Sequence, residues 1–466
     1  FVRGLRWLGP YSPRWGCSDL AALATAKIPR RRTPRNFRTR SQMLRQLIPE
    51  IASSRGRALQ TPRFPHLRGL ISLGERQLEG FLRWRDLLGE AERVAAEALA
   101  ERQASLNFDD VINLQYTSGT TGFPKGAMLT HHNLLNNAFW IGERLSFTHR
   151  DRLCIPVPFY HCFGMVVGNL TCVARGATMV LPAPHFSPLP TLQAIAQERC
   201  TAVHGVPTMF IAELDHPQFR EFDLTSLRTG VMAGAPCPIE IMKRVMAEMH
   251  CEQITIGCGM TEASPICNMT EADDPIDVRV STVGQVMPHQ EQKVIDPTTG
   301  RILPRGAQGE LCYRGYHVMR GYYNNPQATR DAIDASGWLH SGDLAVMDEA
   351  GYVRITGRIK DMICRGGEKI FPREVEEFLF RHPKIAEAYV IGVPDDYYGE
   401  QVVAWIKLKD GAEVTAAQIQ EFCKGQIMNY KIPRYVKFVT EFPTTVTGKV
   451  QKFRMREISA EELGVR

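Results

Sequence analysis

The chain has 466 residues, of which 44% are hydrophobic, 23% charged and 9% aromatic. These values are typical of globular proteins and exclude the collagen-like, disordered and low-complexity classes. The length predicts two to four domains. No window holds 18 uncharged apolar residues, so we predict no transmembrane span.

The formal charge of +6 is unevenly distributed along the chain. Residues 1–70 hold fifteen of the 56 Lys and Arg residues and two of the 50 acids, a net +13, so the remainder carries −7. A basic end is typical of a nucleic-acid arm, a targeting peptide or a segment foreign to the fold. We favour the third, because no other nucleic-acid signal is present. The chain begins with Phe1, which predicts a fragment, a processed form or an incomplete reading.

The twelve cysteines are spread along the chain and form no C-x-x-C pair. This spacing gives no indication of a zinc ribbon or a thioredoxin-like site. Cys154, Cys172 and Cys312 lie in apolar contexts, where a free thiol behaves as a small core residue. We therefore predict a reducing compartment.

The predicted elements begin after residue 40, because residues 1–40 are rich in Arg and Pro and show no apolar period. Met43, Leu44, Leu47, Ile48 and Ile51 mark one face of a helix. A second helix is predicted at Leu87–Gln103.

From Asp110 onward, short strands alternate with helices. This alternation predicts an α/β sheet covered by helices. One helix, His131–Leu145, is expected to turn Leu134, Leu135, Ala138 and Phe139 inward. The other helices are predicted at Leu189–Arg199 and Ile239–Met249, and the strands at Val111–Tyr116, Leu153–Val157, Thr178–Leu181, Thr201–His204, Thr229–Met232 and Gln253–Gly257.

The alternation of strands and helices stops between Ser281 and Tyr323, where Gly and Pro become frequent. Short strand-like segments there predict a β-rich subdomain. After Gly357 a small α+β domain is expected. Its predicted elements are a helix at Pro372–Phe380, strands at Ile385–Gly392 and Gln401–Leu408, and a helix at Thr415–Cys423. We therefore predict a segment outside the fold at 1–40, a large α/β domain at 41–357 that is incomplete at its start, and a mobile small domain at 358–466.

The segment Tyr116–Gly126, of sequence YTSGTTGFPKG, carries the strongest chemical signal. Its glycines allow close approach of the backbone to a ligand. Its hydroxyls and backbone N–H groups suit phosphate oxygens, and Lys125 adds a positive charge. It differs from the P-loop, because no Gly-Lys-Ser/Thr triplet follows at the required spacing.

This segment resembles the phosphate-binding signature of the adenylate-forming superfamily, which includes the acyl-CoA synthetases. Four further stretches resemble the superfamily's motifs in the same order, and the resemblance is good from about Asn107 to Arg456 and weaker from about Ser41. They are Gly259–Glu262, Ser341–Asp343, Gly357–Asp361 running on to Arg365–Glu368, and Pro443–Lys449. The run Arg365–Pro372 is similar to fatty and short-chain acyl-CoA synthetases.

The resemblance implies ATP, Mg²⁺ and coenzyme A, and it assigns roles that the residues' chemistry supports. Lys449 would bridge the attacking carboxylate and the phosphate, Glu262 would hold Mg²⁺, and Asp343 would accept from the ribose hydroxyls. The ordinary alternatives are a surface lysine, an acid at a helix start and a turn residue. The implied catalytic set is Lys449, Glu262 and Thr121, and the implied nucleotide and coenzyme contacts are Thr117, Ser118, Gly119, Thr120, Thr121, Gly122, Lys125, Gly257, Cys258, Thr261, Asp343, Arg358, Lys449, Gly366 and Gly367.

Three further assignments follow from the resemblance. Lys360 occupies the hinge position about which the small domain would swing between two half-reactions. The acyl pocket would be lined by segments containing His161, Phe163, Gly234 and Ala235, although an apolar-flanked histidine is more often a core residue. Cys258 stands where the family commonly has an aromatic ring over adenine, so we expect weaker adenine stacking.

The predicted activity is the ligation of a medium- to long-chain fatty carboxylate to coenzyme A through an acyl-adenylate. Two alternatives stay open, namely another acceptor for the adenylate and a truncated, inactive chain that still binds nucleotide. We expect a carboxylate, ATP and coenzyme A as partners and no nucleic acid. Peripheral membrane contact and the oligomeric state are left open. The predicted location is the cytoplasm, with the mitochondrial matrix as the alternative if the basic end is a transit peptide.

Overall fold

The computed structural model describes residues 38–54, 59–73, 77–117, 124–235, 237–444 and 450–465. Several predictions lie outside these residues: most of the 1–40 segment, the loop positions Ser118, Gly119, Thr120, Thr121 and Gly122, and Lys449. Contacts divide the chain into two units, Phe1–Asn107 and Phe108–Arg466, each considered by itself. The predicted boundaries after residues 40 and 357 stay predictions.

The first unit is small and packs a few apolar side chains around a parallel pair of strands. Its buried cluster comprises Ile48, Ile51, Leu59, Phe64 and Phe81. Its elements are α2 (Arg38–Leu47), β1 (Leu70–Ser72), β2 (Phe81–Arg83), α3 (Trp84–Leu88) and α4 (Ala96–Ala104).

The predicted continuous helix over 87–103 is wrong. Helix α3 ends at Leu88, a 3₁₀ turn follows at Ala91–Arg93, and α4 begins at Ala96. Gly89 disfavours helix continuation, and α4 buries no residue, so no packing holds a longer helix together.

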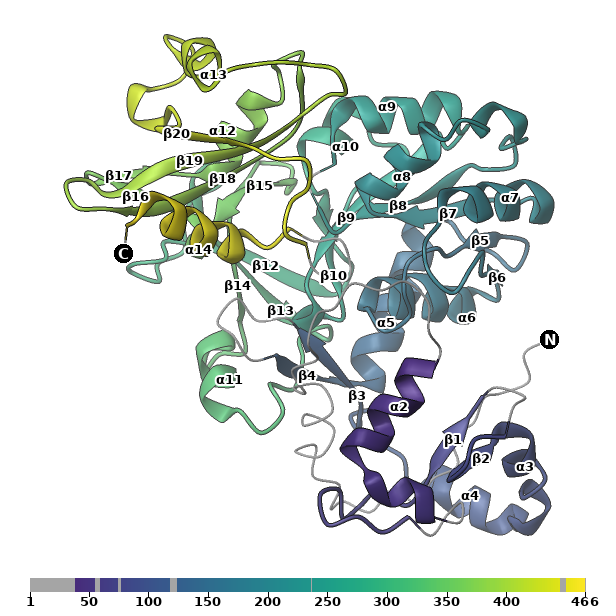
Figure 1. The fold of residues 1–466 in the computed structure, drawn as a ribbon. Coiled ribbons are helices and arrows are strands. Elements are labelled where there is room, and N and C mark those ends of the chain that lie inside the picture. Colours follow the sequence, from purple (N-terminus) through teal and green to yellow (C-terminus); the bar gives the residue numbers. More distant parts are fainter. Residues whose placement is uncertain are drawn as a thin grey trace. The chain divides into compact units, whose positions relative to one another are not determined.

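A seven-stranded mixed sheet forms the centre of the second unit, in the order β11-β10-β9-β8-β7-β5-β6 (Figure 1). Neighbours from β9 to β6 pair in parallel, whereas β10 and β11 are antiparallel. The strands are β5 (Arg152–Cys154), β6 (Thr178–Val180), β7 (Ala202–Gly205), β8 (Thr229–Ala233), β9 (Gln253–Gly259), β10 (Ile266–Met269) and β11 (Gln285–Val286).

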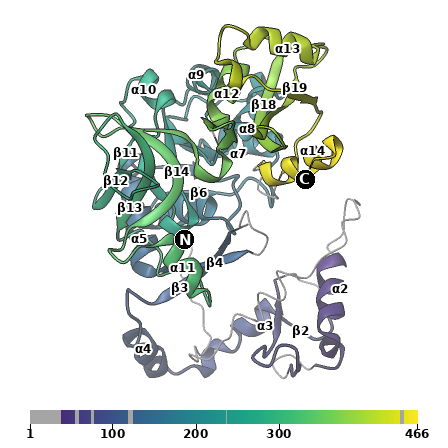
Figure 2. The same cartoon turned by 90° about the vertical axis from the view of Figure 1, so that its left-hand side faces the viewer.

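Helices cover both faces of this sheet, as the alternation of its side chains requires. Cys154, Val203 and Ile254 face one cluster, which contains residues of α7, α8 and α9. Leu153, Ala202 and Val231 face the other cluster, which contains residues of α5 and α6 (Figures 1 and 2). The helices are α5 (His131–Arg144), a π-helix (Phe163–Leu170), α6 (Thr171–Arg175), α7 (Pro188–Glu198), α8 (Pro207–Leu214), α9 (Ile239–Glu248) and α10 (Ile276–Ser281).

The predicted inward face of α5 is half right. Leu134 and Ala138 are buried, but Leu135 and Phe139 are 47% and 39% exposed. Leu135 and Phe139 lie one position further round the helix, beyond the stripe that packs on the sheet. The aromatic ring of Phe139 instead lies 5.2 Å beneath the Arg175 guanidinium.

The predicted β-rich part is a four-stranded antiparallel sheet that continues past Tyr323 to Arg358. Its strands are β12 (Gln290–Ile295), β13 (Gln308–Gly315), β14 (Leu339–Met347) and β15 (Val353–Arg358), with α11 (Pro326–Ala332) between β13 and β14. A separate hairpin pairs β3 (Val111–Thr117) with β4 (Lys125–Thr130).

The carboxyl-terminal part is a five-stranded sheet with helices, as the predicted small α+β domain requires. Apolar residues of β18 and β19 pack with α12 and α13 in one cluster. The elements are β16 (Ile363–Arg365), β17 (Glu368–Ile370), α12 (Pro372–Leu379), β18 (Ile385–Asp395), β19 (Gly399–Leu408), α13 (Ala416–Cys423), β20 (Tyr435–Phe438) and α14 (Lys452–Leu463). The predicted mixed α/β class is confirmed. Within the described ranges, every helix is too short or too polar to cross a bilayer.

Candidate active site

The β3–β4 hairpin holds the two ends of the predicted phosphate loop. Thr117 is the last residue of β3 and pairs directly with Lys125, the first residue of β4. The Lys125 ammonium lies 5.0 Å from the centre of the Tyr322 ring, a cation–π contact. The hairpin therefore brings the loop's positive charge to Tyr322.

Tyr322 also contacts the predicted magnesium ligand. Its hydroxyl donates to Oε1 of Glu262 over 2.7 Å, and the Glu262 side chain is 8% exposed. Burial and the Glu262 carboxylate raise the pKa of Tyr322 far above its usual range, so Tyr322 keeps its proton and acts as the donor. The hydroxyl of Tyr322 therefore orients the carboxylate of Glu262, and the ammonium of Lys125 lies over the ring of the same tyrosine.

Cys162 joins the predicted acyl-pocket segment to this acid. Its buried thiol hydrogen-bonds Thr261 and lies within electrostatic range of Glu262. Burial, reinforced by the negative charge of Glu262, raises the pKa of Cys162 to about 12, so the group is a neutral thiol. The segment that begins at His161 thus adjoins the Thr261–Glu262 turn.

The four predicted pocket residues have different surroundings. His161 is exposed, and its Nδ1 accepts from the Phe163 backbone N–H over 3.1 Å. Phe163 is buried and stacks on the His204 ring at 5.9 Å. Phe163 belongs to the same apolar cluster as Ala233, the last residue of β8. Gly234 and Ala235, which follow Ala233, are exposed.

The predicted ribose contacts form an ion pair across two strands. Asp343 and Arg358 are register partners on β14 and β15, and Nε of Arg358 lies 2.9 Å from Oδ1 of Asp343. The carboxylate of Asp343 raises the pKa of Arg358, despite opposing burial, so the guanidinium stays charged. The pair is a fixed, partly exposed acceptor and donor side by side, which suits a vicinal diol.

Cys258 lies beside this pair, near the end of β9. Burial raises its pKa to about 12, with the Asp343 charge adding to the effect, so the thiol is uncharged. Gly257, directly before it, is buried. Strand β9 therefore delivers Gly257 and Cys258 next to the Asp343–Arg358 pair.

Lys360, the predicted hinge residue, follows β15 by two positions. Desolvation and repulsion by Arg358 lower its pKa, while the charges of Asp361, Asp343 and Glu262 oppose the shift. Its ammonium therefore shares one electrostatic environment with the Asp343–Arg358 pair and Glu262.

The predicted glycine loop is the tight turn between β16 and β17. Gly366 and Gly367 both have positive φ, +59° and +88°, which side chains rarely tolerate. The Gly366 N–H donates to the Tyr398 carbonyl over 2.7 Å, and the Arg365 guanidinium stacks on the Tyr398 ring at 4.2 Å. The turn is thus anchored to the β18–β19 connection.

The predicted site residues fall into two groups. Lys125, Glu262 and Thr261 are connected through Tyr322 and Cys162, and Cys258 lies with the Asp343–Arg358 ion pair. The charges of Glu262 and Asp343 both act on Lys360. Sequence reasoning missed Tyr322 because its partner is 60 residues away in the chain. Its only signal was an aromatic residue beside a glycine, Gly321, in a segment otherwise assigned to strands.

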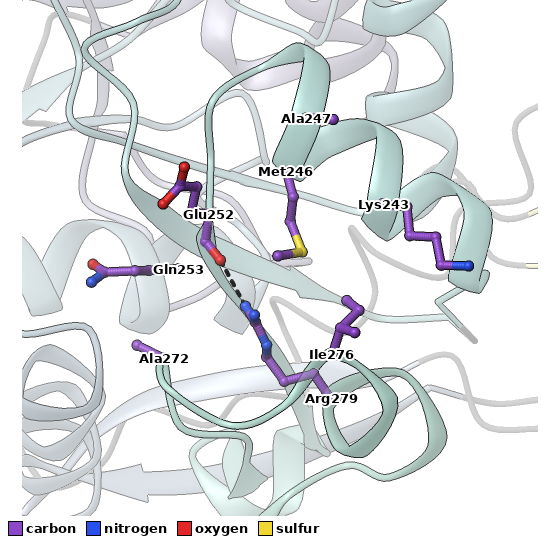
Figure 3. Close-up of a pocket in the computed structure, with 8 residues that line it drawn as sticks. All are labelled: Lys243, Met246, Ala247, Glu252, Gln253, Ala272, Ile276 and Arg279. Carbon is purple, nitrogen blue, oxygen red and sulfur yellow. Dashed lines mark hydrogen bonds between the residues drawn. The ribbon is translucent and has the colours of Figure 1, made fainter.

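A hollow of about 550 Å³ lies elsewhere (Figure 3). Met246 and Ile276 line it together with Arg279, which donates to the carbonyls of Glu252 and Ile254 over 2.9 Å each. Its strand residues are at the start of β9, whereas Cys258 is near the end, about 16 Å away along an extended strand. This hollow is therefore separate from the candidate active site.

Comparisons with known proteins agree with these motifs. The family model described as AMP-binding enzyme matches residues 65–323, and that of the AMP-binding enzyme C-terminal domain matches residues 374–449. YngI of Bacillus subtilis (strain 168), provisionally named an acyl-CoA synthetase, is 53% identical over 90% of this chain and 76% of its own. The mitochondrial medium-chain acyl-CoA ligase ACSF2 of Danio rerio is 45% identical over 91% and 70% of the two chains.

Two solved structures are similar in fold. ATP-bound MatB from Rhodopseudomonas palustris has a TM-score of 0.71 and 31% identity, covering 78% of this chain and 73% of its own. The anthranilate CoA ligase AuaEII in complex with anthranoyl-AMP has a TM-score of 0.77 and 28% identity, covering 91% and 78%.

Proposed function

Because the chain belongs to the AMP-binding enzyme family and its relatives are acyl-CoA synthetases and ligases, we propose that it activates a medium- to long-chain fatty carboxylate with ATP and passes the acyl group to coenzyme A. The observation that carries the proposal is the pair of contact groups Lys125–Tyr322–Glu262 and Asp343–Arg358, whose acids Glu262 and Asp343 both act electrostatically on Lys360. The name of the ACSF2 relative supports the medium-chain part of the range.

In the first half-reaction, a carboxylate oxygen attacks the α-phosphorus of ATP and pyrophosphate leaves. Asp343 accepts from the ribose hydroxyls, and Arg358, already paired to it, donates beside it. Thr117, Lys125 and the loop Ser118–Gly122 bind the phosphate oxygens. Lys449 neutralises charge between the two reacting anions, where its effect on the rate is largest.

Glu262 fits a magnesium ligand. Its carboxylate is buried, Tyr322 occupies Oε1, and Oε2 is the atom we assign to the cation. Mg²⁺ prefers one or two carboxylates together with phosphate oxygens and would supply neutralisation of the triphosphate charge. Thr261, directly before this acid, is hydrogen-bonded to the Cys162 thiol.

In the second half-reaction, the thiol of coenzyme A attacks the acyl carbon, its proton leaves, and AMP is released. Gly366 and Gly367 lack side chains where the pantetheine arm would pass. The small domain would swing about Lys360, which lies in the sequence between the Asp343–Arg358 pair and the carboxyl-terminal domain. His161, Phe163, Gly234 and Ala235 belong to the segments assigned to the acyl chain.

The test is a panel of C2–C18 carboxylates, each scored for AMP formation with and without coenzyme A. We expect a maximum among medium to long chains and AMP release that depends on coenzyme A. AMP formation that is indifferent to coenzyme A would favour another acceptor, and ADP plus phosphate would contradict the proposal. The cytoplasm and the mitochondrial matrix both stay candidate locations, and the mitochondrial names of relatives support the second.

A further inference from the structure

Three side chains with metal-binding atoms meet on one face of the β12–β15 sheet. Glu310 and Cys312 are two positions apart on β13 and so share one face of the strand. His340 on β14 is the register partner of Cys312. Their neighbours Leu311 and Leu339 belong to the apolar cluster on the other face. The three side chains therefore project away from that core, and Glu310 and Cys312 are nevertheless buried.

The ligand atoms are already close to the spacing of a tetrahedral site. Sγ of Cys312 is 3.7 Å from Nδ1 of His340, and this nitrogen is 2.9 Å from Oε2 of Glu310. All three atoms lie within 4.8 Å of one another. Bond lengths of about 2.3 Å to sulfur and 2.0–2.1 Å to nitrogen place tetrahedral S and N ligands about 3.6 Å apart. The S–N edge already has this length, and the shorter N–O edge has to widen on binding.

Polar groups lie next to two of the ligands. Oδ2 of Asp334 lies 4.0 Å from Nε2 of His340, on the side away from the cluster. Its Oδ1 accepts from the N–H groups of Ser336 and Trp338. A carboxylate behind the second nitrogen is a common support for a metal-bound histidine.

The second oxygen of Glu310 is also occupied. Oε1 accepts from the Gly342 N–H over 3.2 Å, so Oε2 is directed to His340. Lys293 pairs with Cys312 across β12 and β13, and its positive charge opposes a cation. The Lys293 ammonium is, however, placed 4.2 Å over the Trp338 ring.

We propose that Oε2 of Glu310, Sγ of Cys312 and Nδ1 of His340 bind a divalent transition-metal ion of the Zn²⁺ class. A thiolate–imidazole–carboxylate set suits Zn²⁺ and Co²⁺, whereas Mg²⁺ takes oxygen ligands. The thiol proton is released to solvent on binding. His340 is 30% exposed, which gives the ion a path of entry from solvent.

The three proposed metal ligands lie on β13 and β14, close to the Asp343–Arg358 ion pair. Glu310 binds the backbone of Gly342, and His340 is three residues before Asp343 on the same strand. A bound ion would therefore stiffen the part of β14 that carries Asp343. The metal site is independent of the acyl substrate, so it stands or falls separately from the proposed ligase activity.

The test is a titration of the full chain, stripped with chelator, with Co²⁺ followed by absorbance. We expect one equivalent to bind with a thiolate-to-cobalt charge-transfer band that Zn²⁺ abolishes and Mg²⁺ does not. Cys312→Ser should lose the band, and the matched control Cys364→Ser, at an exposed thiol on β16, should keep it. Asp334→Asn should weaken binding about 10- to 100-fold.

Because Cys312 is buried, Cys312→Ser could fail to fold, so His340→Asn provides a second arm at a partly exposed position. Zn²⁺ should raise the thermal midpoint of the unmodified chain and not that of His340→Asn. Absence of the band in the unmodified chain, its survival in Cys312→Ser, its loss in Cys364→Ser, or an equal thermal shift in His340→Asn would each overturn the site.

Discussion

Glu213 is a buried acid in an apolar part of the second unit. It lies on α8 and is 1% exposed, and its Oε2 has no hydrogen-bond partner among the residues that the structure describes. Its neighbours on the helix, Phe210 and Leu214, belong to the apolar cluster beneath the sheet. Burial raises the pKa of Glu213 from its ordinary 4.5 to about 8, so the folded protein keeps this group protonated at neutral pH.

The sign of the resulting pH dependence follows from proton uptake. Below pH 4.5 both states hold the proton, and above about pH 8 both release it. Between these values the unfolded chain releases the proton and the folded chain keeps it, so stability falls as pH rises. Each pH unit costs about 1.36 kcal/mol, which gives about 2.5 kcal/mol between pH 5.5 and 7.5 with these two pKa values.

Glu213→Gln removes the titration while nearly conserving shape. We expect the free energy of unfolding of the variant, relative to the parent, to rise by about 2.5 kcal/mol from pH 5.5 to 7.5. The unsatisfied amide of the glutamine lowers the free energy of unfolding by the same amount at every pH. The test is therefore the change of the difference with pH, and not its absolute value.

The measurement is urea unfolding at pH 5.5, 6.5 and 7.5, with Glu240→Gln as control. Glu240 is on the exposed side of α9, with 79% of its side chain accessible, so its substitution should give a flat difference. A flat difference for Glu213→Gln as well would show that burial does not hold the proton and would refute the reasoning.

Three further predictions concern the candidate active site. Asp343→Ala removes a charged acceptor and should raise the KM for ATP about 10- to 100-fold with the fold retained; an unchanged KM in steady-state assays would return Asp343 to a turn role. Lys449→Ala should slow acyl-adenylate formation about 10²- to 10³-fold and spare thioester formation from supplied acyl-adenylate, and equal losses in separate half-reaction assays would exclude the domain swing. Tyr322→Phe should weaken Mg²⁺ activation about tenfold, with Tyr323→Phe as control, and coinciding Mg²⁺ curves for the two variants would remove Tyr322 from the site.

Local patterns in the sequence were enough to place most strands and helices, because each depends on neighbouring residues. Periodicity set α7 and α9 to within a residue of their observed starts. It failed at 87–103, where helix-forming residues lack any surface to pack against. It also assigned Phe139 to the core, because apolar character alone does not reveal which edge of a stripe meets the sheet.

The site depended on long-range pairing, which one sequence does not specify. The motif resemblance selected Asp343 and Arg358 separately, but their contact follows from the register of β14 on β15. The contact of Tyr322 with Glu262 is of the same kind, since it joins different elements. The approach of Glu310 to His340 likewise required the pairing of β13 with β14.

In the β3–β4 hairpin, most of the residues proposed to bind phosphate lie outside the paired ladder of the two strands. Thr117 and Lys125 pair at the end of the ladder that runs from Val111 to Thr130, and seven residues lie between them in the sequence. Substitutions at those seven positions leave every residue of the ladder in place, so we expect them to affect the proposed phosphate contacts more than the strand pairing. Exchanging these seven residues between homologues would therefore change the kinetics of the proposed reaction while the paired strands stay the same. Natural mutation can produce the same kind of change.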